Sequence, residues 1–425
     1  MPDTLEEVIL KNRGITFHFI KTDKFKTISL FLKLKAPLTK ADATKRALLP
    51  YVLQSGTNTY SNSSALRKFL DDLYGATLFV DLQKKGEYHI ISISMDVANE
   101  KFLNDRTPLL EKAIQLLSDV IFNPKTTQDG FDKEIVEKEK RTLKQRIRVV
   151  YDDKMRYANL RLVEEMCKDE PYSIHVNGIL EDVDQINEKN LYEYYKSVLK
   201  EDQIDLYVVG DVDINQLQLI CKQYFQFEDR TPKEIDKNLY RQSEKENVVI
   251  ERQDVAQGKL NIGFRTNITY GDSDYFALQV YNGLFGGFPH SKLFINVREK
   301  ASLAYYAASR IESHKGLMMV MTGIEPKNYD QALSIIKEQF QAMNNGEFSE
   351  NELEQTKAVI QNQMLETLDT ARGMTEVLYH NVLSNSKVPE EVWMEKIKQV
   401  TKEDVIQVGK KIVLDTIYFL TGQEG

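Results

Sequence analysis

Apolar residues recur along this chain with two different periods. In the segments 27–35 and 259–264 every second residue is apolar, which predicts strands that bury one face. In the segment 63–75 apolar residues recur every three or four positions, which predicts an amphipathic helix. Strand and helix segments are grouped rather than regularly alternating, and this favours an α+β fold over a doubly wound parallel sheet.

Two pairs of segments repeat each other's pattern. Residues 182–213 and 395–425 each carry apolar positions, a polar residue at a predicted helix start, an amphipathic helix and a short apolar strand. The matching apolar positions are Val183, Ile186 and Leu191 against Ile397, Val400 and Val405. Residues 73–95 and 303–323 each indicate a strand, a Lys-Gly turn and a second strand. The sequence therefore predicts one α+β domain that occurs twice.

The predicted domains are residues 1–226 and 248–425, joined by a linker at 227–247. At least two domains are expected because 425 residues exceed the size at which a single hydrophobic core usually stops growing. In the predicted linker, charged and polar residues and one proline interrupt the apolar periodicity.

Composition and charge narrow the classes of function. The contents of 42% hydrophobic and 28% charged residues are typical of an ordinary globular protein. A net charge of -8, from 64 acidic and 56 basic residues spread along the chain, argues against a nucleic-acid partner. No stretch has the pattern of a signal peptide or of a membrane span. Cys167 and Cys221 lie far apart and outside any CxxC arrangement, so we predict buried cysteines and a cytoplasmic location.

The segment 274–312 carries a Gly-Gly turn, a Ser-x-Leu-Phe, an Arg-Glu-Lys and a Leu-Ala-Tyr, in that order. With supporting matches at 170–186, 206–213 and 257–264, the sequence resembles the pitrilysin/insulinase family of zinc peptidases nearly from end to end. The resemblance is to the two-domain type found in bacteria and in mitochondrial processing peptidases. It implies two homologous α+β domains, each an antiparallel-rich sheet packed with helices, of the metallohydrolase type of LuxS and the processing peptidases.

The resemblance also implies where a zinc site would lie in this chain. Active members carry HxxEH on a first-domain helix just before a Gly-Thr, which supplies two histidine ligands and a glutamate base. Counting back from the Gly-Thr at 56–57 places Ala47 and Tyr51 at the histidine positions and Pro50 at the glutamate position. We therefore expect no catalytic residue and no metal in this chain, and a helix that Pro50 kinks or shortens at its start.

The third zinc ligand of the family is a glutamate on a later helix. Glu137 lies at the corresponding place, either as a vestigial ligand or as an ordinary charge on an exposed helix face. The six histidines include no pair four residues apart, and no other group of His, Asp and Glu has the spacing of a zinc site. An active metallopeptidase with rearranged ligands is therefore disfavoured.

The second half keeps a pair of residues that, in the family, contacts the substrate. An arginine and a tyrosine seven residues apart project there toward the zinc site, and Arg298 and Tyr305 have that spacing and context. A guanidinium can donate charge-assisted hydrogen bonds to a peptide carbonyl, and a phenol can donate to a developing oxyanion. The alternative is that Arg298 pairs with a carboxylate and that Tyr305 or Tyr306 belongs to the core.

Retained substrate contacts beside a lost metal centre favour a non-catalytic subunit. Four such domains close a chamber in the family, and this chain has two, so we predict a heterodimer with a homologous subunit that carries HxxEH and zinc. The complex would process a peptide, whereas this chain alone would not be an active peptidase. The alternative is a stand-alone peptide-binding or scaffold protein of the same fold. In either case an exposed strand edge at 75–83 could add an extended peptide.

Overall fold

A computed structural model describes residues 5–104, 107–235 and 245–422 of the chain. The residues group by contact into two compact units. The first unit comprises Met1–Val149, Ile174–Ile235 and Asp369–Glu376, and the second comprises Val150–Ser173, Asp236–Leu368 and Val377–Gly425. Of the predicted linker at 227–247, residues 236–244 lie outside the described residues.

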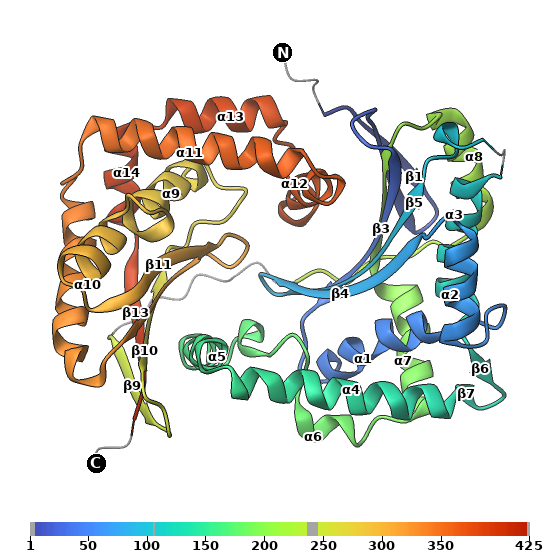
Figure 1. The fold of residues 1–425 in the computed structure, drawn as a ribbon, viewed down its shortest axis with the longest axis horizontal. Coiled ribbons are helices and arrows are strands. Elements are labelled where there is room, and N and C mark those ends of the chain that lie inside the picture. Colours follow the sequence, from blue (N-terminus) through green and yellow to red (C-terminus); the bar gives the residue numbers. More distant parts are fainter. Residues whose placement is uncertain (1–4, 105–106, 236–244, 423–425) are drawn as a thin grey trace. The chain divides into compact units, whose positions relative to one another are not determined.

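The first unit is built on a six-stranded sheet with the order β1-β2-β8-β3-β5-β4 (Figure 1). Only β2 and β8 run parallel among its paired strands. The register places Leu30 opposite both Met95 and Val208, so the predicted apolar face of residues 27–35 is buried. The strands are β1 (Glu7–Asn12), β2 (Ile15–Lys21), β3 (Thr27–Pro37), β4 (Thr77–Lys85), β5 (Tyr88–Ala98) and β8 (Gln203–Gly210).

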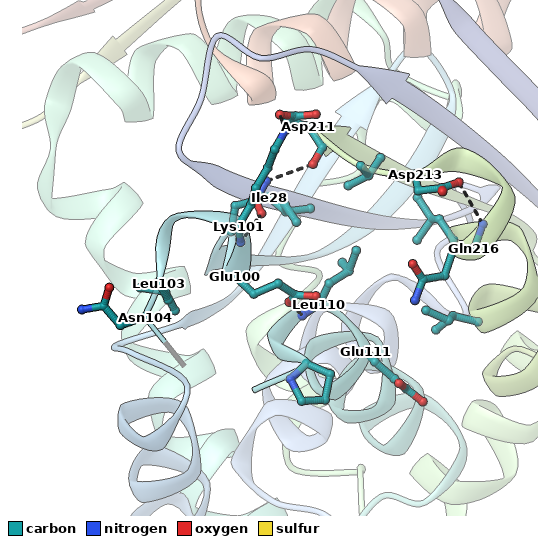
Figure 2. A pocket seen from close by; sticks show the side chains of 15 residues that line it. Ile28, Glu100, Lys101, Leu103, Asn104, Leu110, Glu111, Asp211, Asp213 and Gln216 are labelled. Carbon is teal, nitrogen blue, oxygen red and sulfur yellow. Dashed lines mark hydrogen bonds and ion pairs between the residues drawn. The ribbon is translucent and has the colours of Figure 1, made fainter. Parts of the chain in front are cut away.

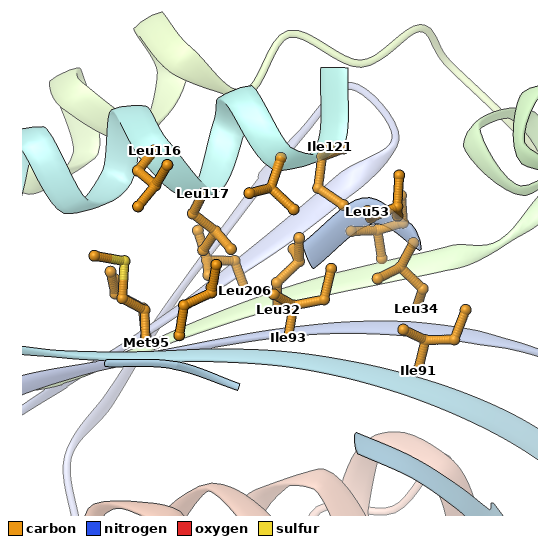
Figure 3. Close-up of a cluster of buried hydrophobic side chains, with 14 of the residues drawn as sticks. Leu32, Leu34, Leu53, Ile91, Ile93, Met95, Leu116, Leu117, Ile121 and Leu206 are labelled. Atoms are coloured by element: carbon orange, nitrogen blue, oxygen red, sulfur yellow. The ribbon is translucent and has the colours of Figure 1, made fainter. Parts of the chain in front are cut away.

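Helices of the first unit cover the apolar face of this sheet. Figure 3 shows Leu116, Leu117 and Ile121 of α3 above the side chains of the strands. The helices are α1 (Ala43–Ser55), α2 (Ser63–Asp72), α3 (Leu109–Phe122), α4 (Lys133–Asp152), α6 (Leu180–Val183), α7 (Glu188–Glu201) and α8 (Ile214–Tyr224). A 3-10 turn η1 (Glu100–Phe102) and a short hairpin of β6 (Thr126–Thr127) and β7 (Gly130–Phe131) complete the unit.

The second unit contains a five-stranded sheet with the order β11-β12-β10-β13-β9 (Figure 1). Its one parallel pair, β13 with β9, corresponds to β8 with β2 in the first unit. Read from the opposite edge, this order repeats the order β2-β8-β3-β5-β4. The duplicated α+β fold predicted from the sequence is therefore confirmed. The strands are β9 (Asn247–Arg252), β10 (Gly258–Arg265), β11 (Ala304–Glu312), β12 (Leu317–Ile324) and β13 (Val413–Thr421).

Both faces of the second sheet are covered by helices. One face packs on α9 (Tyr275–Asn282), α10 (Tyr329–Asn344), α11 (Glu350–Leu368), α13 (Glu390–Gln399), α14 (Lys402–Gly409) and the π-helical turns η3 (Gly283–Gly287) and η4 (Phe294–Lys300). The other face packs on α5 (Lys154–Met166), which is followed by the 3-10 turn η2 (Pro171–Ser173). The turn η5 (Pro326–Asn328) precedes α10, and α12 (Ala371–Ser384) follows α11.

Two segments pack with the unit of the other sequence half. Helix α5 belongs to the second unit because Leu162 and Met166 cover an apolar sheet face that includes Met319 and Tyr418. The start of α12, up to Glu376, belongs to the first unit. Each of these segments therefore packs with the unit formed mainly by the other predicted domain. The domain boundaries at 226 and 248 describe the repeat in the sequence and stay a prediction.

The helix starts and the Lys-Gly turns that the sequence predicted in the two repeats occur in the structure. Asn187 and Thr401 each begin a helix with a capping box, at the polar positions that the sequence predicted. Gly86 and Gly316 have φ values of 54° and 72°, so the two Lys-Gly turns use the left-handed region that glycine tolerates. None of the helices in the described part of the chain has the length and apolar character needed to cross a membrane.

The buried guanidinium of Arg46 connects α1 to the first sheet. It donates to the carbonyl oxygens of Leu34 at 2.7 Å and His89 at 3.0 Å, and to the carboxylate of Asp202 at 2.6 Å. The hydroxyl of Tyr194 accepts a further bond at 3.3 Å. The Arg46 guanidinium therefore connects α1 with β3, β5 and α7. Removing the charge of Arg46 or of Asp202 would leave the other charge buried without its partner.

We expect Asp202→Ala to lower the free energy of unfolding by about 3–5 kcal/mol, because Arg46 would stay buried without its counter-charge. Urea titration followed by circular dichroism measures the change. Asp184→Ala is the matched control, since Asp184 is an exposed carboxylate that pairs with Lys144 at 2.6 Å, and it should leave the titration nearly unchanged. Equal curves for the two variants would contradict the anchoring role of Arg46.

A second buried charge cluster lies on the opposite face of the first sheet. The imidazole of His18 contacts Glu7 through Nδ1 at 2.6 Å and Asp205 through Nε2 at 3.1 Å. Burial alone would lower the pKa of His18, but the hydrogen bonds and charges of Asp205 and Glu7 outweigh it and raise the pKa to about 9. The protonated ring thus holds β1 and β8 on either side of β2.

The raised pKa of His18 makes part of the stability depend on pH. The folded state holds this proton more tightly than the unfolded state, so the contribution is complete below about pH 6.5 and is lost as the pH rises through about 9. We expect the native chain to lose about 3 kcal/mol relative to His18→Gln between these values. Urea titrations across the range measure this difference, with His290→Gln as the control. A parallel pH dependence for native chain and His18→Gln would refute the assignment.

Candidate functional site

Helix α1 carries the three positions at which the family would place zinc-binding and catalytic groups. It begins at Ala43 and ends at Ser55, so Pro50 lies inside the helix rather than before its start. Ala47 is fully buried in the core of the first unit, Pro50 is buried, and Tyr51 is half-buried. The first two side chains have no donor atom, and a phenol is not among the His, Cys, Asp and Glu groups that hold zinc in proteins.

The residue of α4 that faces Tyr51 is an arginine. The Cζ atom of Arg146 lies 3.3 Å from the centroid of the Tyr51 ring. Its three guanidinium nitrogens are buried against the Tyr51 side chain. Burial lowers the pKa of Arg146, against the opposing influence of Tyr51 and Glu139.

Two turns before Arg146, α4 makes a second contact with α1. The hydroxyl of Ser55 donates to the buried carboxylate of Glu139 at 3.1 Å and to the carbonyl oxygen of Tyr51 at 3.0 Å. We refer to Tyr51, Ser55, Glu139 and Arg146 together as the vestigial centre. Its members come from two helices that lie against each other in the first unit.

The vestigial centre does not fit a zinc ion. A guanidinium cation lies against one of the two histidine positions, and the other holds the methyl group of Ala47. Within residues 5–104, 107–235 and 245–422 no group of three or more His, Cys, Asp or Glu side chains is arranged to hold a metal. The vestigial centre therefore offers a metal one carboxylate, that of Glu139, beside a guanidinium of like charge.

Glu137 lies on a different face of α4. Its carboxylate is 49% exposed and pairs with Lys140 at 2.9 Å, while Lys140 also donates to the carbonyl oxygen of Ile186. The carboxylate that contacts α1 is Glu139 instead. The structure thus does not bring Glu137 together with Ala47, Pro50 and Tyr51, and its role as a vestigial ligand stays a prediction.

Sequence reasoning missed Glu139 and Arg146, although a signal was present. Leu143 and Ile147 form the buried stripe of α4, and Glu139 and Arg146 lie one turn from Leu143 on either side. Charged residues within an apolar stripe face the interior of the protein, where they require an explanation.

The structure does bring Arg298 and Tyr305 together in the second unit. Arg298 lies in the π-helical turn η4, with its Cζ atom 4.4 Å from the Phe294 ring centroid and 5.5 Å from that of Tyr305. Tyr305 is 81% exposed in β11, at the edge of the sheet, where the pairing with β12 is irregular between Ala304 and Ala307. Tyr305 is therefore not a core residue, and its phenol is presented to solvent beside a cation.

The Gly-Gly turn of the 274–312 segment explains how this surface is supported. At Gly286 a Cβ atom would lie 2.6 Å from the hydroxyl oxygen of Ser309 and 2.7 Å from its backbone nitrogen. Only glycine therefore lets η3 approach β11 so closely. The turn η3, which makes this contact, and the turn η4, which carries Arg298, both have π-helical geometry, which is frequent at functional sites.

Each unit also contains a hollow away from these residues. In the first unit a cavity of about 450 Å³ is lined by Glu100, Lys101, Asp211 and Asp213, among others, and Lys101 pairs with Asp211 inside it (Figure 2). In the second unit a cavity of about 390 Å³ lies between β11 and helices α9, α11, α12 and α13. None of the predicted site residues is among the described residues that line either cavity.

Comparisons with known proteins give the family context. The sequence matches the family model described as Peptidase M16 inactive domain over residues 185–360. It is 58% identical to the probable inactive metalloprotease YmfF of Bacillus subtilis strain 168, over 99% of each chain. It is 22% identical to the antilisterial bacteriocin subtilosin biosynthesis protein AlbE of Bacillus subtilis, over 92% of this chain and 95% of that protein. A crystal structure of a conserved protein from Enterococcus faecalis V583 has a TM-score of 0.91 at 37% identity, with 99% of both chains covered.

We expect the purified chain to contain well below one zinc per molecule and to cleave no peptide. Both expectations follow from the side chains at positions 47, 50 and 51, which provide neither chelation nor a base. Elemental analysis and digestion of a peptide library, with an HxxEH-bearing homologue as the positive control, measure the two properties. One zinc per chain with chelator-sensitive cleavage would contradict this expectation.

Proposed function

The chain belongs to the peptidase M16 family, the pitrilysin/insulinase family of zinc peptidases, as a non-catalytic member, and we propose that it pairs with a homologous chain that carries HxxEH. In this proposal the heterodimer forms a peptide-processing chamber, the zinc belongs to the partner, and this chain supplies Arg298 and Tyr305. The observation that carries the proposal is the contrast between the two units. The first lacks the HxxEH groups, whereas the second presents a half-buried cation and an exposed phenol on adjacent elements.

The geometry of Arg298 suits a role in holding an extended peptide. Arg298 is half-buried and its guanidinium lies near both the Phe294 and Tyr305 rings, which limits its rotation. A guanidinium held in this way loses less conformational freedom when it binds a carbonyl group than a free one does. Tyr305 adds a donor whose hydroxyl can approach charge that develops on the substrate.

Two outer sheet strands support a peptide as the ligand. Strand β4 is the outer strand of the first sheet, with Phe79 58% exposed, and β11 is the outer strand of the second. An extended peptide can pair with such an edge through backbone hydrogen bonds. The name of the relative AlbE, a bacteriocin biosynthesis protein, is also consistent with a peptide as the molecule acted upon.

The same edges support a second candidate, a stand-alone peptide-binding or scaffold protein of this fold. That role requires the exposed edge of β4 but neither a zinc-bearing partner nor the hydroxyl of Tyr305. A cytoplasmic location is part of both proposals, and the reduced thiols of Cys167 and Cys221 are compatible with a reducing compartment.

The partner role is tested by reconstituting this chain with an HxxEH-bearing homologue from the same genome. We expect Tyr305→Phe to lower peptide turnover of the complex by about ten- to a thousandfold, because it removes one donor to the oxyanion. Assembly, measured by size-exclusion chromatography with light scattering, and the melting temperature should not change, since the Tyr305 side chain is exposed.

Tyr306→Phe is the matched control at the neighbouring position. Its hydroxyl is buried without a hydrogen-bond partner in the described residues, so its removal should leave turnover unchanged. Undiminished turnover in a correctly assembled Tyr305→Phe complex would eliminate the shared active site. Failure of the two chains to associate would favour the stand-alone binding protein.

A further inference from the structure

We propose that the guanidinium of Arg146 takes the place of the metal ion in the vestigial centre, as a permanent cation that keeps divalent metals out. The inference concerns the first unit alone and is independent of a partner chain. It extends the absence of zinc ligands to an active exclusion of the metal. A chain of this kind would not compete with a zinc-bearing protein for the ion.

The positions of the contacts identify Arg146 as the residue opposite the lost metal. Glu139 contacts Ser55, and Arg146 contacts Tyr51. Positions increase along α4 as they decrease along α1, so the two helices run antiparallel at this point. Seven residues of α4 make about two turns, which places both contacts on one face of the helix. Position 146 therefore faces the second histidine position directly.

Position 137 cannot take this role without a rotation of α4. Two residues correspond to about 200° around a helix axis, so Glu137 points away from the face that Glu139 shares with Arg146. Its carboxylate is exposed and paired with Lys140. A ligand that completes a metal site with α1 would have to come from position 146, where the chain has the opposite charge.

The surroundings of Arg146 differ from those of an ordinary structural arginine. Arg46, in the same unit, is fully buried and donates to two carbonyl groups, a hydroxyl and a carboxylate. The nitrogens of Arg146 are also inaccessible, but the guanidinium lies against an aromatic ring, and the groups that act on its charge are Tyr51 and Glu139. Nearby Glu139 is hydrogen-bonded to Ser55 and paired with Lys138 at 3.3 Å.

Arg146 opposes metal binding both by its charge and by the space that its side chain fills. A divalent ion placed between α1 and α4 would meet a like charge in a poorly solvated environment, where repulsion is strong. The stacked Arg146 and Tyr51 side chains also occupy the space between the helices that a metal and its ligands would need. Restoring the α1 ligands alone should therefore not restore a metal site.

The test measures zinc affinity in two restored chains, by competition with a chromophoric chelator. The first carries Ala47→His, Pro50→Glu and Tyr51→His, and the second carries Arg146→Glu in addition. We expect the second to bind one zinc per chain at least a hundredfold more tightly than the first. The matched control replaces Arg148, an exposed arginine of the same helix, by glutamate in the first chain and should leave its affinity unchanged.

A smaller pair of variants covers the case in which the larger set does not fold. Tyr51→His alone is compared with Tyr51→His combined with Arg146→Glu, and both keep Ala47 and Pro50. The spectrum of bound cobalt reports whether position 146 provides a ligand, and we expect at least a tenfold gain in cobalt affinity for the combined variant. Equal affinity within both pairs, including no binding at all, would overturn the proposal.

Discussion

The buried ion pair between Arg46 and Asp202 is the interaction on which the first unit depends most. Apolar burial attaches α1 to the sheet without fixing its rotation, because the hydrophobic effect has no direction. The bonds from Arg46 to the carbonyl groups of Leu34 and His89 fix that rotation, since hydrogen bonds require a defined geometry. Ala47, the next residue, is thereby held in the core, and Tyr51 one turn later is held against α4. The helix that would carry a metal in an active relative thus keeps its place without one.

A buried arginine has a comparable role in the second unit. Arg265 of β10 donates to the carbonyl oxygen of Met166 at 2.6 Å and to the carboxylates of Glu170 and Asp415, both at 2.7 Å. Lys315 contributes a second cation to Glu170 at 2.7 Å. These contacts join the end of α5 to the sheet face that it covers. Helix α5 and the helices of the other face cover the sheet on both sides, and Tyr305 is exposed in the outer strand β11.

The two units share one architecture but present different side chains on it. Their strand orders match, yet the first unit has a ring and a cation between α1 and α4, while the second has an arginine and a tyrosine near each other in η4 and β11. Loss of chemistry in one unit need not destabilise the other, because each has its own hydrophobic core. This separation explains how a non-catalytic chain can preserve the whole fold of a peptidase.

The sequence by itself determined those features that neighbouring residues encode. Periods of two and of three to four, the Asn187 and Thr401 caps and the Lys-Gly turns predicted the duplicated α+β fold, and the absent HxxEH predicted a non-catalytic member of the family. Only the tertiary structure decided which residues of distant segments meet. The placement of α5 on the second sheet, the contact of Arg146 rather than Glu137 with α1, and the exposure of Tyr305 depend on rotations of whole helices and on the order of strands. A local pattern fixes which side of an element is buried, but the partner that buries it is selected by packing among segments far apart in the chain.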